Sequence, residues 1–458
     1  MNRRGWSGVL TVVLLLAIVG CSGGKGEGGG GDWEALDKEE QVNLRVMYWS
    51  SQQFMSEYGM LFASEFPNVE IEVVSRQGFQ RDPEKPLEEA LSEFMEKERI
   101  DVAFLLDDEY ERLASKGQLL DLEPAVQGSS YSLEGFNPAI LAQLRSEGDG
   151  KLYGLSPFFT SKALFYNIDL FEKHKVELPR DSMTWEEVFE LAKRFPTDGD
   201  EKNRVYGFTI DGFMSPLFYT FEIGAAQNLG VLNDDLTELQ LNSPGWEKVF
   251  EMIVSAVKSG AFYLPSEEEV SKTMRTLEDD RFITGRSAMT FQNAYQIGNI
   301  LYSKNQLKNV KPVNWGIVTA PVDPNNRTQS SVYEHGGVFA IPAKSSNYKA
   351  AWEFIKYANS AEYAKIKANS NNGELFSRTE FNRPQDGREI DAFYKLEPKA
   401  VVKNEFAQVP QGLDWQLLEL ISKELTAAAE DKKTLDAAIG TIQEEGQALL
   451  VQRKSAQK

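Results

Sequence analysis

Short strand-like segments alternate with helix-like segments from residue 42 onward, and this alternation limits the possible folds more than any other feature of the chain. VNLRVMYW (42–49) and VEIEVVS (69–75) have the pattern of strands, and PLEEALSEFMEKE (86–98) gathers its apolar residues on one helical face. IDVAFLL (100–106) is an apolar run of the kind that forms a buried parallel strand. Strands and helices in this order predict an α/β fold with a mostly parallel sheet.

Strand-like segments return late in the chain, after a middle third that has an α/β pattern of its own. NWGIVTAPV (314–322) and GGVFAIPA (336–343) are predicted to be strands. TWEEVFELAKRF (184–195) is predicted to be a helix that begins with a capping box, because Glu187 follows the N-cap residue Thr184 by three positions. A chain of 458 residues is also too long for one ordinary core. We therefore expect two lobes.

The charge and composition of the chain exclude several classes of partner and cofactor. The formal net charge is -20, and a field of that sign repels nucleic-acid phosphates and anionic lipid. With a single cysteine, Cys21, the chain cannot form an internal disulfide or a metal site built on several cysteines. Its two histidines, His174 and His335, share no short ligand spacing. We expect no nucleic-acid partner, no metal and no cofactor.

Residues 1–20 are predicted to be a secretory signal. Arg3 and Arg4 precede an apolar run (9–19) that is too short to span a bilayer, which takes about 20 residues. This pattern places the mature protein outside the cytoplasm.

The residues around Cys21 resemble the lipobox of bacterial lipoproteins, since IVG (18–20) directly precedes the cysteine. In that motif the signal is removed ahead of the cysteine, its sulfur is diacylated, and the lipid chains hold the protein on the cell membrane. An ordinary signal peptide with an incidental cysteine is the alternative. The glycine-rich segment 22–32 cannot form a core and is expected to be flexible. We therefore assign 21–41 to a lipidated N-terminus and a tether.

Four blocks of the sequence resemble the extracellular solute-binding proteins of carbohydrate ABC importers (family 1). The block 100–124 contains the pattern G-x-L-x-D-L, and 152–195 is similar to the block most typical of the family. FITGRSAMTFQNAY (282–295) resembles the family's F-x-x-G-x-x-A-M strand, and the fourth block is 336–364. The four blocks follow one another in the family's order and at ordinary spacing.

This resemblance implies a two-lobed, type II periplasmic-binding-protein-like fold. Each lobe would be a mostly parallel sheet flanked by helices, and crossover strands would join the discontinuous lobes. Lobe one would hold 42–158 and 316–362, and lobe two would hold 159–315 and 363–458. The lobes would close around a ligand through a hinge. The function implied is that of a monomeric receptor without enzyme activity, which binds a sugar, most often an oligosaccharide, and delivers it to an ABC permease.

Candidate ligand residues follow from the chemistry of a sugar, whose hydroxyl groups need polar partners and whose flat C–H face needs aromatic rings. Such groups lie in loops at the carboxyl ends of strands. The resemblance implies that an acid at or near Asp108 accepts hydrogen bonds from sugar hydroxyls and that the Tyr295 ring stacks on the ligand. The alternative for Asp108 is that it complements the dipole at a helix N-terminus, and the alternative for Tyr295 is a place in the core. Some relatives have a glutamate where Thr160 stands, which leaves its role open. The candidates are Trp49, Ser51, Gln52, Asp107, Asp108, Phe158, Thr160, Asn293, Tyr295, Tyr333, His335, Gly336, Gly337 and Trp415.

Other functions are compatible with parts of this pattern. The same fold can bind a non-sugar solute or present its ligand to a membrane sensor, and the sequence does not separate these functions from import. A secreted glycosidase is a more remote alternative, because its two carboxylates must face each other across the scissile bond, whereas adjacent acids such as Asp107 and Asp108 point apart. The G-x-S-x-G match at 20–24 lacks the strand and helix that the motif requires.

Overall fold

The computed structural model describes most of the chain after residue 32. The described residues are 33, 36–37, 39–80, 82, 85–106, 108–129, 131–200, 203–210, 215–266, 269, 276–368, 373–399, 405–409 and 412–456. They belong to one unit, Trp33–Lys458. The predicted signal (1–20), the lipidation site Cys21, the glycine-rich part of the tether and the candidate Asp107 lie outside the described residues.

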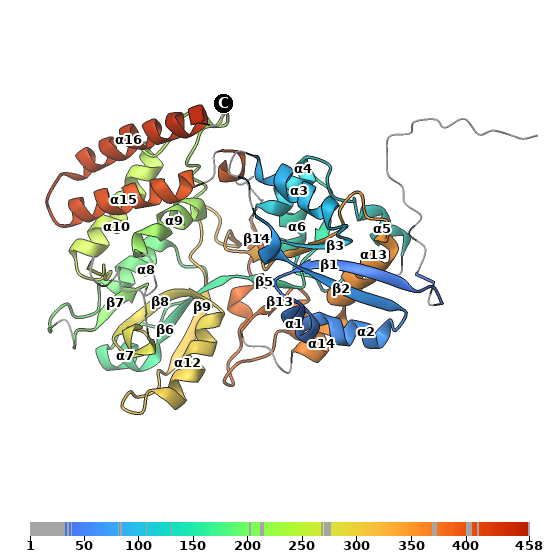
Figure 1. The fold of residues 1–458 in the computed structure, drawn as a ribbon. Coiled ribbons are helices and arrows are strands. Elements are labelled where there is room, and N and C mark those ends of the chain that lie inside the picture. Colours follow the sequence, from blue (N-terminus) through green and yellow to red (C-terminus); the bar gives the residue numbers. More distant parts are fainter. Residues whose placement is uncertain are drawn as a thin grey trace, which may run out of the picture. The chain divides into compact units, whose positions relative to one another are not determined.

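The first sheet has five strands in the order β2-β1-β3-β12-β4. Its strands are β1 (Val42–Tyr48), β2 (Val69–Ser75), β3 (Val102–Leu105), β4 (Gly154–Leu155) and β12 (Val338–Ala340). β1 pairs in parallel with β2 and β3, while β12 is antiparallel to β3 and β4. The apolar run predicted as a buried strand is β3, all of whose residues are buried. This sheet is the centre of lobe one (Figure 1).

The second sheet has four strands in the order β7-β8-β6-β9 and is the centre of lobe two (Figure 1). Its strands are β6 (Lys162–Asn167), β7 (Tyr206–Thr209), β8 (Ser287–Asn293) and β9 (Trp315–Thr319). β7 and β8 are parallel, whereas β6 is antiparallel to both β8 and β9. In each sheet a single strand, β12 in the first and β6 in the second, runs against the others, so both sheets are mixed but mostly parallel, as expected.

The position of the hinge explains why the sheets are mixed. Val338, which begins β12, lies opposite Leu105 at the end of β3. Likewise, Lys162 begins β6 opposite Asn293 at the end of β8. A strand that enters a sheet at the carboxyl edge of its neighbour must run antiparallel to it. Both lobes consequently present their carboxyl strand ends to the hinge, where ligand groups were expected.

Three passes of the chain join the lobes through a small antiparallel sheet of order β11-β5-β13, which we call the hinge sheet. It contains β5 (Phe158–Thr160), β11 (Glu334–His335) and β13 (Leu375–Phe376). A separate two-stranded sheet pairs β10 (Gln329–Ser330) with β14 (Glu397–Pro398). The lobe boundaries implied by the resemblance require all three passes, but the strand of the third pass was not predicted, because β13 has only two residues.

Two of the expected lobe boundaries differ from the structure. Residues 316–319 belong to β9 and pair with β6, so they lie in the second sheet. The helix α14 (Ala361–Lys367) stays on lobe one, because the ring of its Tyr363 stacks on the Tyr58 ring with a centroid distance of 5.1 Å. Sequence patterns identify individual strands, but the point at which a chain crosses between lobes is set by tertiary pairing.

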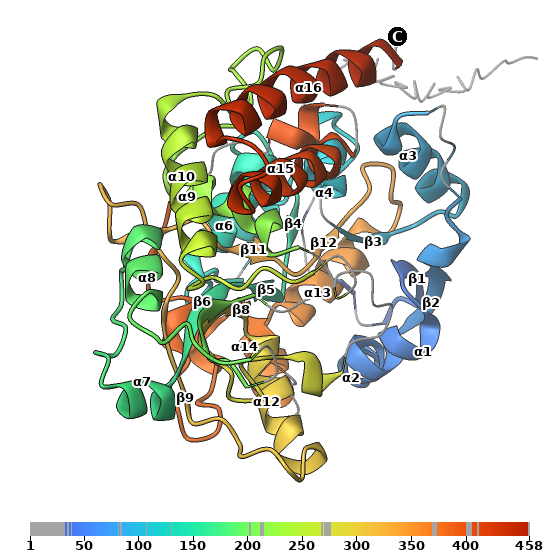
Figure 2. The ribbon, with the colours of Figure 1, turned by 90° about the vertical axis from the view of Figure 1, so that its left-hand side faces the viewer.

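Helices cover both sheets, and α15 and α16 lie side by side on lobe two in both views (Figures 1 and 2). In the part of the chain that the structure describes, no helix combines the length and apolar character needed to cross a bilayer. The helices of lobe one are α1 (Ser51–Phe54), α2 (Met60–Glu65), α3 (Leu87–Lys97), α4 (Glu109–Ser115), α5 (Glu123–Gly128), α6 (Pro138–Glu147), α13 (Tyr348–Ala358) and α14 (Ala361–Lys367). Those of lobe two are α7 (Ile168–His174), α8 (Trp185–Ala192), α9 (Thr220–Ala226), α10 (Pro244–Lys258), α12 (Tyr295–Gln306), α15 (Leu413–Ala429) and α16 (Leu435–Ala456).

The hydrophobic core is continuous across the hinge. One cluster contains the core of lobe one together with Phe159 of the hinge sheet and Phe165 and Trp315 of the second sheet. A second cluster fills the other face of the second sheet, where Leu164 points. Because neighbouring residues of a strand point to opposite faces, β6 contributes to both clusters.

Trp33 begins the described fold and packs on the outside of lobe one. Its ring makes edge contacts with Tyr348 (5.3 Å) and Trp352 (6.2 Å) of α13. Next to Tyr348, the Asn347 side-chain amide donates to the Asn43 carbonyl at the start of β1 (3.1 Å). Trp33 therefore lies near the end of the sheet that is farthest from the hinge.

The predicted capping box at the start of α8 is confirmed. Thr184 Oγ1 accepts the Glu187 N–H, and Glu187 Oε2 accepts the Thr184 N–H. The Glu187 carboxylate also pairs with Arg327 at 2.8 Å and with Arg180 at 2.9 Å. The hydrogen bond from Arg327 is the largest effect on the pKa of Glu187, and with the Thr184 N–H and Arg180 it outweighs burial and lowers that pKa to about 2.

We predict that Glu187→Gln destabilises the fold at neutral pH and much less in acid. The folded-state pKa lies below the unfolded value of about 4.3, so the ionised carboxylate stabilises the fold above that pH and its contribution is lost as the pH falls toward 2. The side chain is 31% exposed, so screening limits the expected loss to about 0.5–1 kcal/mol at neutral pH. Urea unfolding measures it, with the exposed neighbour Glu186→Gln as the control. A loss of equal size at both pH values would contradict the ion-pair explanation.

Candidate functional site

The two faces of the hinge sheet have different surroundings. Antiparallel partners point to the same face, and Thr160 pairs with Glu334 while Phe158 pairs with Phe376. The opposite face carries Phe159 and Leu375, which are each 1% exposed, and the His335 side chain, which is 5% exposed. One face of the hinge sheet is thus part of the core, and the other can face a ligand.

A cavity of about 460 Å³ lies between the lobes at this open face, and we call it the cleft pocket. Tyr48 and Trp49 line it at the carboxyl end of β1, and Phe158 and Gly336 line it from the hinge. Tyr295, the first residue of α12, lines it from lobe two. Its volume is within the range of small-molecule sites, about 300–1,000 Å³.

The helix after β1 supplies the polar wall of the cleft pocket. Between α1 and α2 lies a π-helical segment, Met55–Gly59, which places both Glu57 and Tyr58 in the pocket lining. π-helical turns inside α-helices frequently occur at functional sites. Gln53, one helical turn before Glu57, lines the same wall.

Hydrogen bonds hold the Glu57 carboxylate in place. The Tyr48 hydroxyl donates to Glu57 Oε2 at 2.5 Å, and the Gln53 amide donates to Glu57 Oε1 at 2.9 Å. The Tyr363 hydroxyl donates to the Glu57 backbone carbonyl at 3.2 Å. Burial, reinforced by the hydrogen bond to Glu57, raises the pKa of Tyr48 far above its ordinary value, so Tyr48 stays a neutral donor. The carboxylate therefore keeps a fixed position as an acceptor.

Aromatic rings form most of the remaining wall. The Tyr58 and Tyr363 rings are stacked with an interplanar angle of 14°. The Phe158 ring packs on Phe376 at 5.0 Å and against the edge of Tyr363 at 6.3 Å. Tyr295 is 43% exposed, which leaves much of its side chain available to a ligand.

Two further charged groups, Glu374 and Lys367, line the cleft pocket. Burial of the carboxyl group and the proximity of Glu57 raise the pKa of Glu374, and Lys367 opposes this effect. The Lys367 ammonium donates to the Ser56 backbone carbonyl at 3.2 Å. The pocket thus contains two carboxylates and one ammonium group.

Four of the predicted ligand residues come together in the cleft pocket: Trp49, Phe158, Tyr295 and Gly336. Ser51 and Gln52 are exposed in the first turn of α1 and do not line it. Thr160 points to the open face of the hinge sheet, beyond the pocket lining.

Other predicted ligand residues have structural partners instead. Asp108 pairs with Arg112 one turn along α4 at 2.5 Å, and the Asn293 side chain accepts the Tyr295 N–H at the start of α12. His335 lies on the core face of the hinge sheet, where its Nε2 is 3.3 Å from Glu147 Oε2. Gly337 has φ +105°, and a Cβ there would lie 2.3 Å from the Phe104 ring, so close packing requires this glycine.

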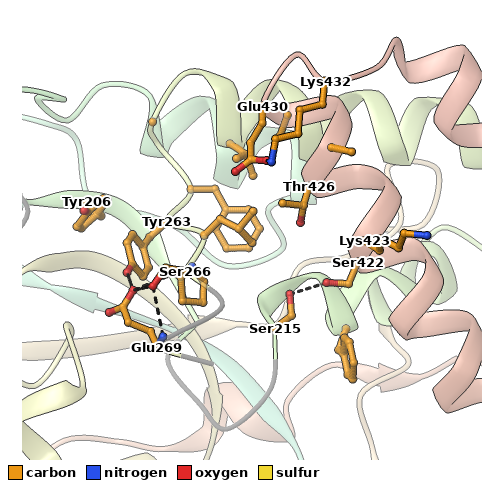
Figure 3. A pocket seen from close by; sticks show the side chains of 18 of the residues that line it. Tyr206, Ser215, Tyr263, Ser266, Glu269, Ser422, Lys423, Thr426, Glu430 and Lys432 are labelled. Carbon is orange, nitrogen blue, oxygen red and sulfur yellow. Dashed lines mark hydrogen bonds and ion pairs between the residues drawn. The ribbon is translucent and has the colours of Figure 1, made fainter. Parts of the chain in front are cut away.

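The last two predicted ligand residues line other cavities. Tyr333 lines a cavity of about 440 Å³ at the β11 edge of the hinge sheet, and its hydroxyl donates to the Leu396 carbonyl. Trp415 lines a groove of about 1400 Å³ beside α15, shown in Figure 3, where its ring makes an edge contact with Phe218 at 5.0 Å. Ser215 and Ser422 are hydrogen-bonded across this groove (Figure 3). All lining residues of the groove come from lobe two, so the cleft pocket remains the better candidate for a site between lobes.

Sequence reasoning missed the residues that the first helix and the third hinge pass bring to the pocket. Gln53 and Glu57 are four residues apart, so their shared helical face could have been recognised. Glu374 and Phe376 had no such signal, because β13 has only two residues. Across the described ranges, no three His, Cys, Asp or Glu side chains form a set that could hold a metal ion.

Residues 62–380, more than two thirds of the chain, match the family described as bacterial extracellular solute-binding protein. The chain belongs to this family. Its members are binding proteins that act outside the cytoplasm, which agrees with a pocket between two lobes.

Individual relatives are more distant. An sn-glycerol-3-phosphate-binding periplasmic protein of Rhizobium meliloti is 24% identical over 55% of this chain and 55% of its own length. Its counterpart in Brucella melitensis is 21% identical over 74% of this chain and 77% of its own length. The chain thus spans about half the length of the first relative and three quarters of the second.

Solved structures confirm the two-lobed fold. A sugar transporter from Rhizobium etli in an open conformation has a TM-score of 0.66 at 19% identity, covering 89% of this chain and 99% of that one. A sugar-binding protein from Xanthomonas citri has a TM-score of 0.65 at 17% identity, and the match covers 90% of this chain and 98% of that one.

We predict that Glu57→Ala destabilises the free protein, because it leaves the Tyr48 hydroxyl without its partner. Tyr48 is only 3% exposed, and an unpaired buried polar group costs about 1–3 kcal/mol. Urea unfolding measures the effect, and Glu65→Ala, at an exposed position of α2, is the control. Equal stability of the two variants would show that the Tyr48–Glu57 bond contributes nothing to the fold.

Proposed function

We propose that this protein is a receptor that binds a sugar, preferably an oligosaccharide, in the cleft pocket and delivers it to the permease of an ABC importer. The observation that carries the proposal is the lining of the pocket, which combines aromatic rings and carboxylates from the hinge and both lobes. Rings can pack on the C–H face of a sugar, and fixed carboxylates can accept its hydroxyl protons. The relatives of known structure named as sugar-binding proteins support this choice of ligand.

Glycerol 3-phosphate is the second candidate, because relatives are named for binding it. A phosphate group would meet Glu57 and Glu374 in the cleft pocket, where Lys367 is the only cation among the lining residues that the structure describes. Like charges at short range are repulsive. The charge of the pocket therefore favours a sugar over a phosphate ester.

The location of the receptor is part of the proposal. We propose that the signal (1–20) is removed, that Cys21 carries the lipid anchor, and that the monomeric receptor faces the extracellular or periplasmic side of the cell membrane. The sole cysteine of the chain, preceded by IVG, supports this arrangement. We assign no catalytic role, and presentation of the ligand to a membrane sensor is the alternative to import.

We predict that sugars bind through Tyr295. In isothermal titration against mono- and oligosaccharides, Tyr295→Ala should weaken binding by about 1–3 kcal/mol, the range of a lost aromatic contact. Tyr302→Ala is the matched control, since Tyr302 is on the same helix, is 59% exposed and does not line the pocket. Binding of glycerol 3-phosphate but of no sugar in the panel would overturn the sugar assignment. Unchanged affinity of Tyr295→Ala would remove Tyr295 from the site.

We predict that Cys21→Ser abolishes membrane attachment. Without the thiol no diacyl group can be added, so the variant should lose labelling by a radioactive fatty acid and move to the soluble fraction. Folding should be unaffected, because Cys21 precedes the described fold, and sugar titration on the released protein checks this. Unchanged labelling would refute the lipobox assignment.

A further inference from the structure

The cleft pocket has an excess of negative charge beside an aromatic wall. Glu57 and Glu374 line it, and among the described residues of the lining Lys367 is the only positively charged one. Both carboxylates line the same pocket, and burial of the Glu374 carboxyl group, reinforced by the negative charge of Glu57, raises its pKa. A neutral ligand would leave this repulsion in place, whereas a cationic group would relieve it.

The Glu57 carboxylate is built to accept a further donor. Its two oxygens accept one hydrogen bond each, from Tyr48 and from Gln53. A carboxylate offers about four acceptor positions, so each oxygen retains capacity for another donor. An ammonium group donates three hydrogen bonds and accepts none, which matches this capacity.

The adjoining rings favour the same type of group. Tyr58 and Tyr363 are stacked beside Glu57, and Phe158 makes an edge contact with Tyr363. Aromatic faces attract cations, and the attraction grows where water is excluded. The Lys367 ammonium, 5.9 Å from the Tyr363 ring centroid, shows that a cation is accommodated next to this wall.

We propose that the sugar held in the cleft pocket is an amino sugar, whose ammonium group lies between Glu57 and Glu374 beside the tyrosine rings. This inference rests on the proposed sugar-binding function and narrows it to cationic saccharides. Neutral sugars satisfy the same acceptors through hydroxyl groups but gain nothing from the charge. Phosphorylated and acidic sugars are repelled.

Matched ligands test the charge preference. Isothermal titration at low salt is carried out with glucosamine, galactosamine, mannosamine and β-1,4-linked oligomers of glucosamine. Each amine is compared with two neutral partners, its N-acetylated form and the parent sugar that has a hydroxyl group in place of the amine. At least one free amine should bind about tenfold more tightly than its two neutral partners, the ratio expected from one charge-assisted contact. This advantage should shrink with added salt, and it should also shrink as the pH falls and Glu374 becomes protonated.

Two substitutions, one that removes a negative charge and one that removes a positive charge, test where in the pocket the amine preference arises. Glu374→Gln keeps the shape of the side chain but removes its charge, so the affinity for the amine should fall more than the affinity for its neutral partners, and the advantage of the amine should shrink to about a few-fold. Lys367→Gln removes the competing cation and should increase the advantage. Glu362→Gln, at an exposed position of α14 outside the pocket lining, controls for the overall charge of the protein and should change nothing.

The outcomes separate this inference from the proposed function. If neutral sugars bind as tightly as the amines, or bind while no amine binds, the amine assignment is wrong and sugar binding stands. If no saccharide of either kind binds, both are wrong. An amine preference that persists in Glu374→Gln without loss would place the ammonium elsewhere and overturn the assignment.

Discussion

The alternation of side chains in β5 determines how the two lobes and the site fit together. Phe159 points into a core that continues from lobe one to the second sheet, and Phe158 on the other face lines the cleft pocket. β11 and β13 pair with β5 on either side and repeat the same division. A register shift of one residue would move Phe159 into the pocket and Phe158 into the core. The three residues of β5 therefore both connect the lobes through the shared core and form part of the pocket wall that faces a ligand.

This arrangement also explains which parts of the site could be predicted from the sequence. The rule that ligand groups follow the carboxyl ends of strands predicted Trp49 and Tyr295, and both line the cleft pocket. His335 was a natural candidate because it precedes two glycines, but alternation within β11 turns it into the core and turns Glu334 outward. The strand was too short for this alternation to be visible in the sequence. Glu57 was missed although its spacing of four residues from Gln53 indicates a shared helical face.

The fold was more predictable than the site. Strands β1 and β3 and the capped helix α8 follow from local patterns of apolar residues and from the spacing of Thr184 and Glu187. The direction of β6 and β12 does not follow from local patterns, because it depends on where the chain re-enters each sheet. For the same reason, the predicted return of the chain to lobe one at residue 316 was wrong, because residues 316–319 belong to β9 of the second sheet. Local sequence patterns predict the helices and strands, whereas long-range pairing determines whether a strand is parallel or antiparallel to its neighbours.

The packing of Trp33 on α13 has a practical consequence. Trp33 contacts Tyr348, which lies beside the start of β1, and the pocket opens at the other end of that strand. Seven residues of strand separate the two points, a distance of about 20 Å. A fluorescent label, a bead or a sensor chip coupled ahead of residue 33 would therefore hold the protein by the back of lobe one. Such a device could report the arrival of a solute without covering the entrance it uses.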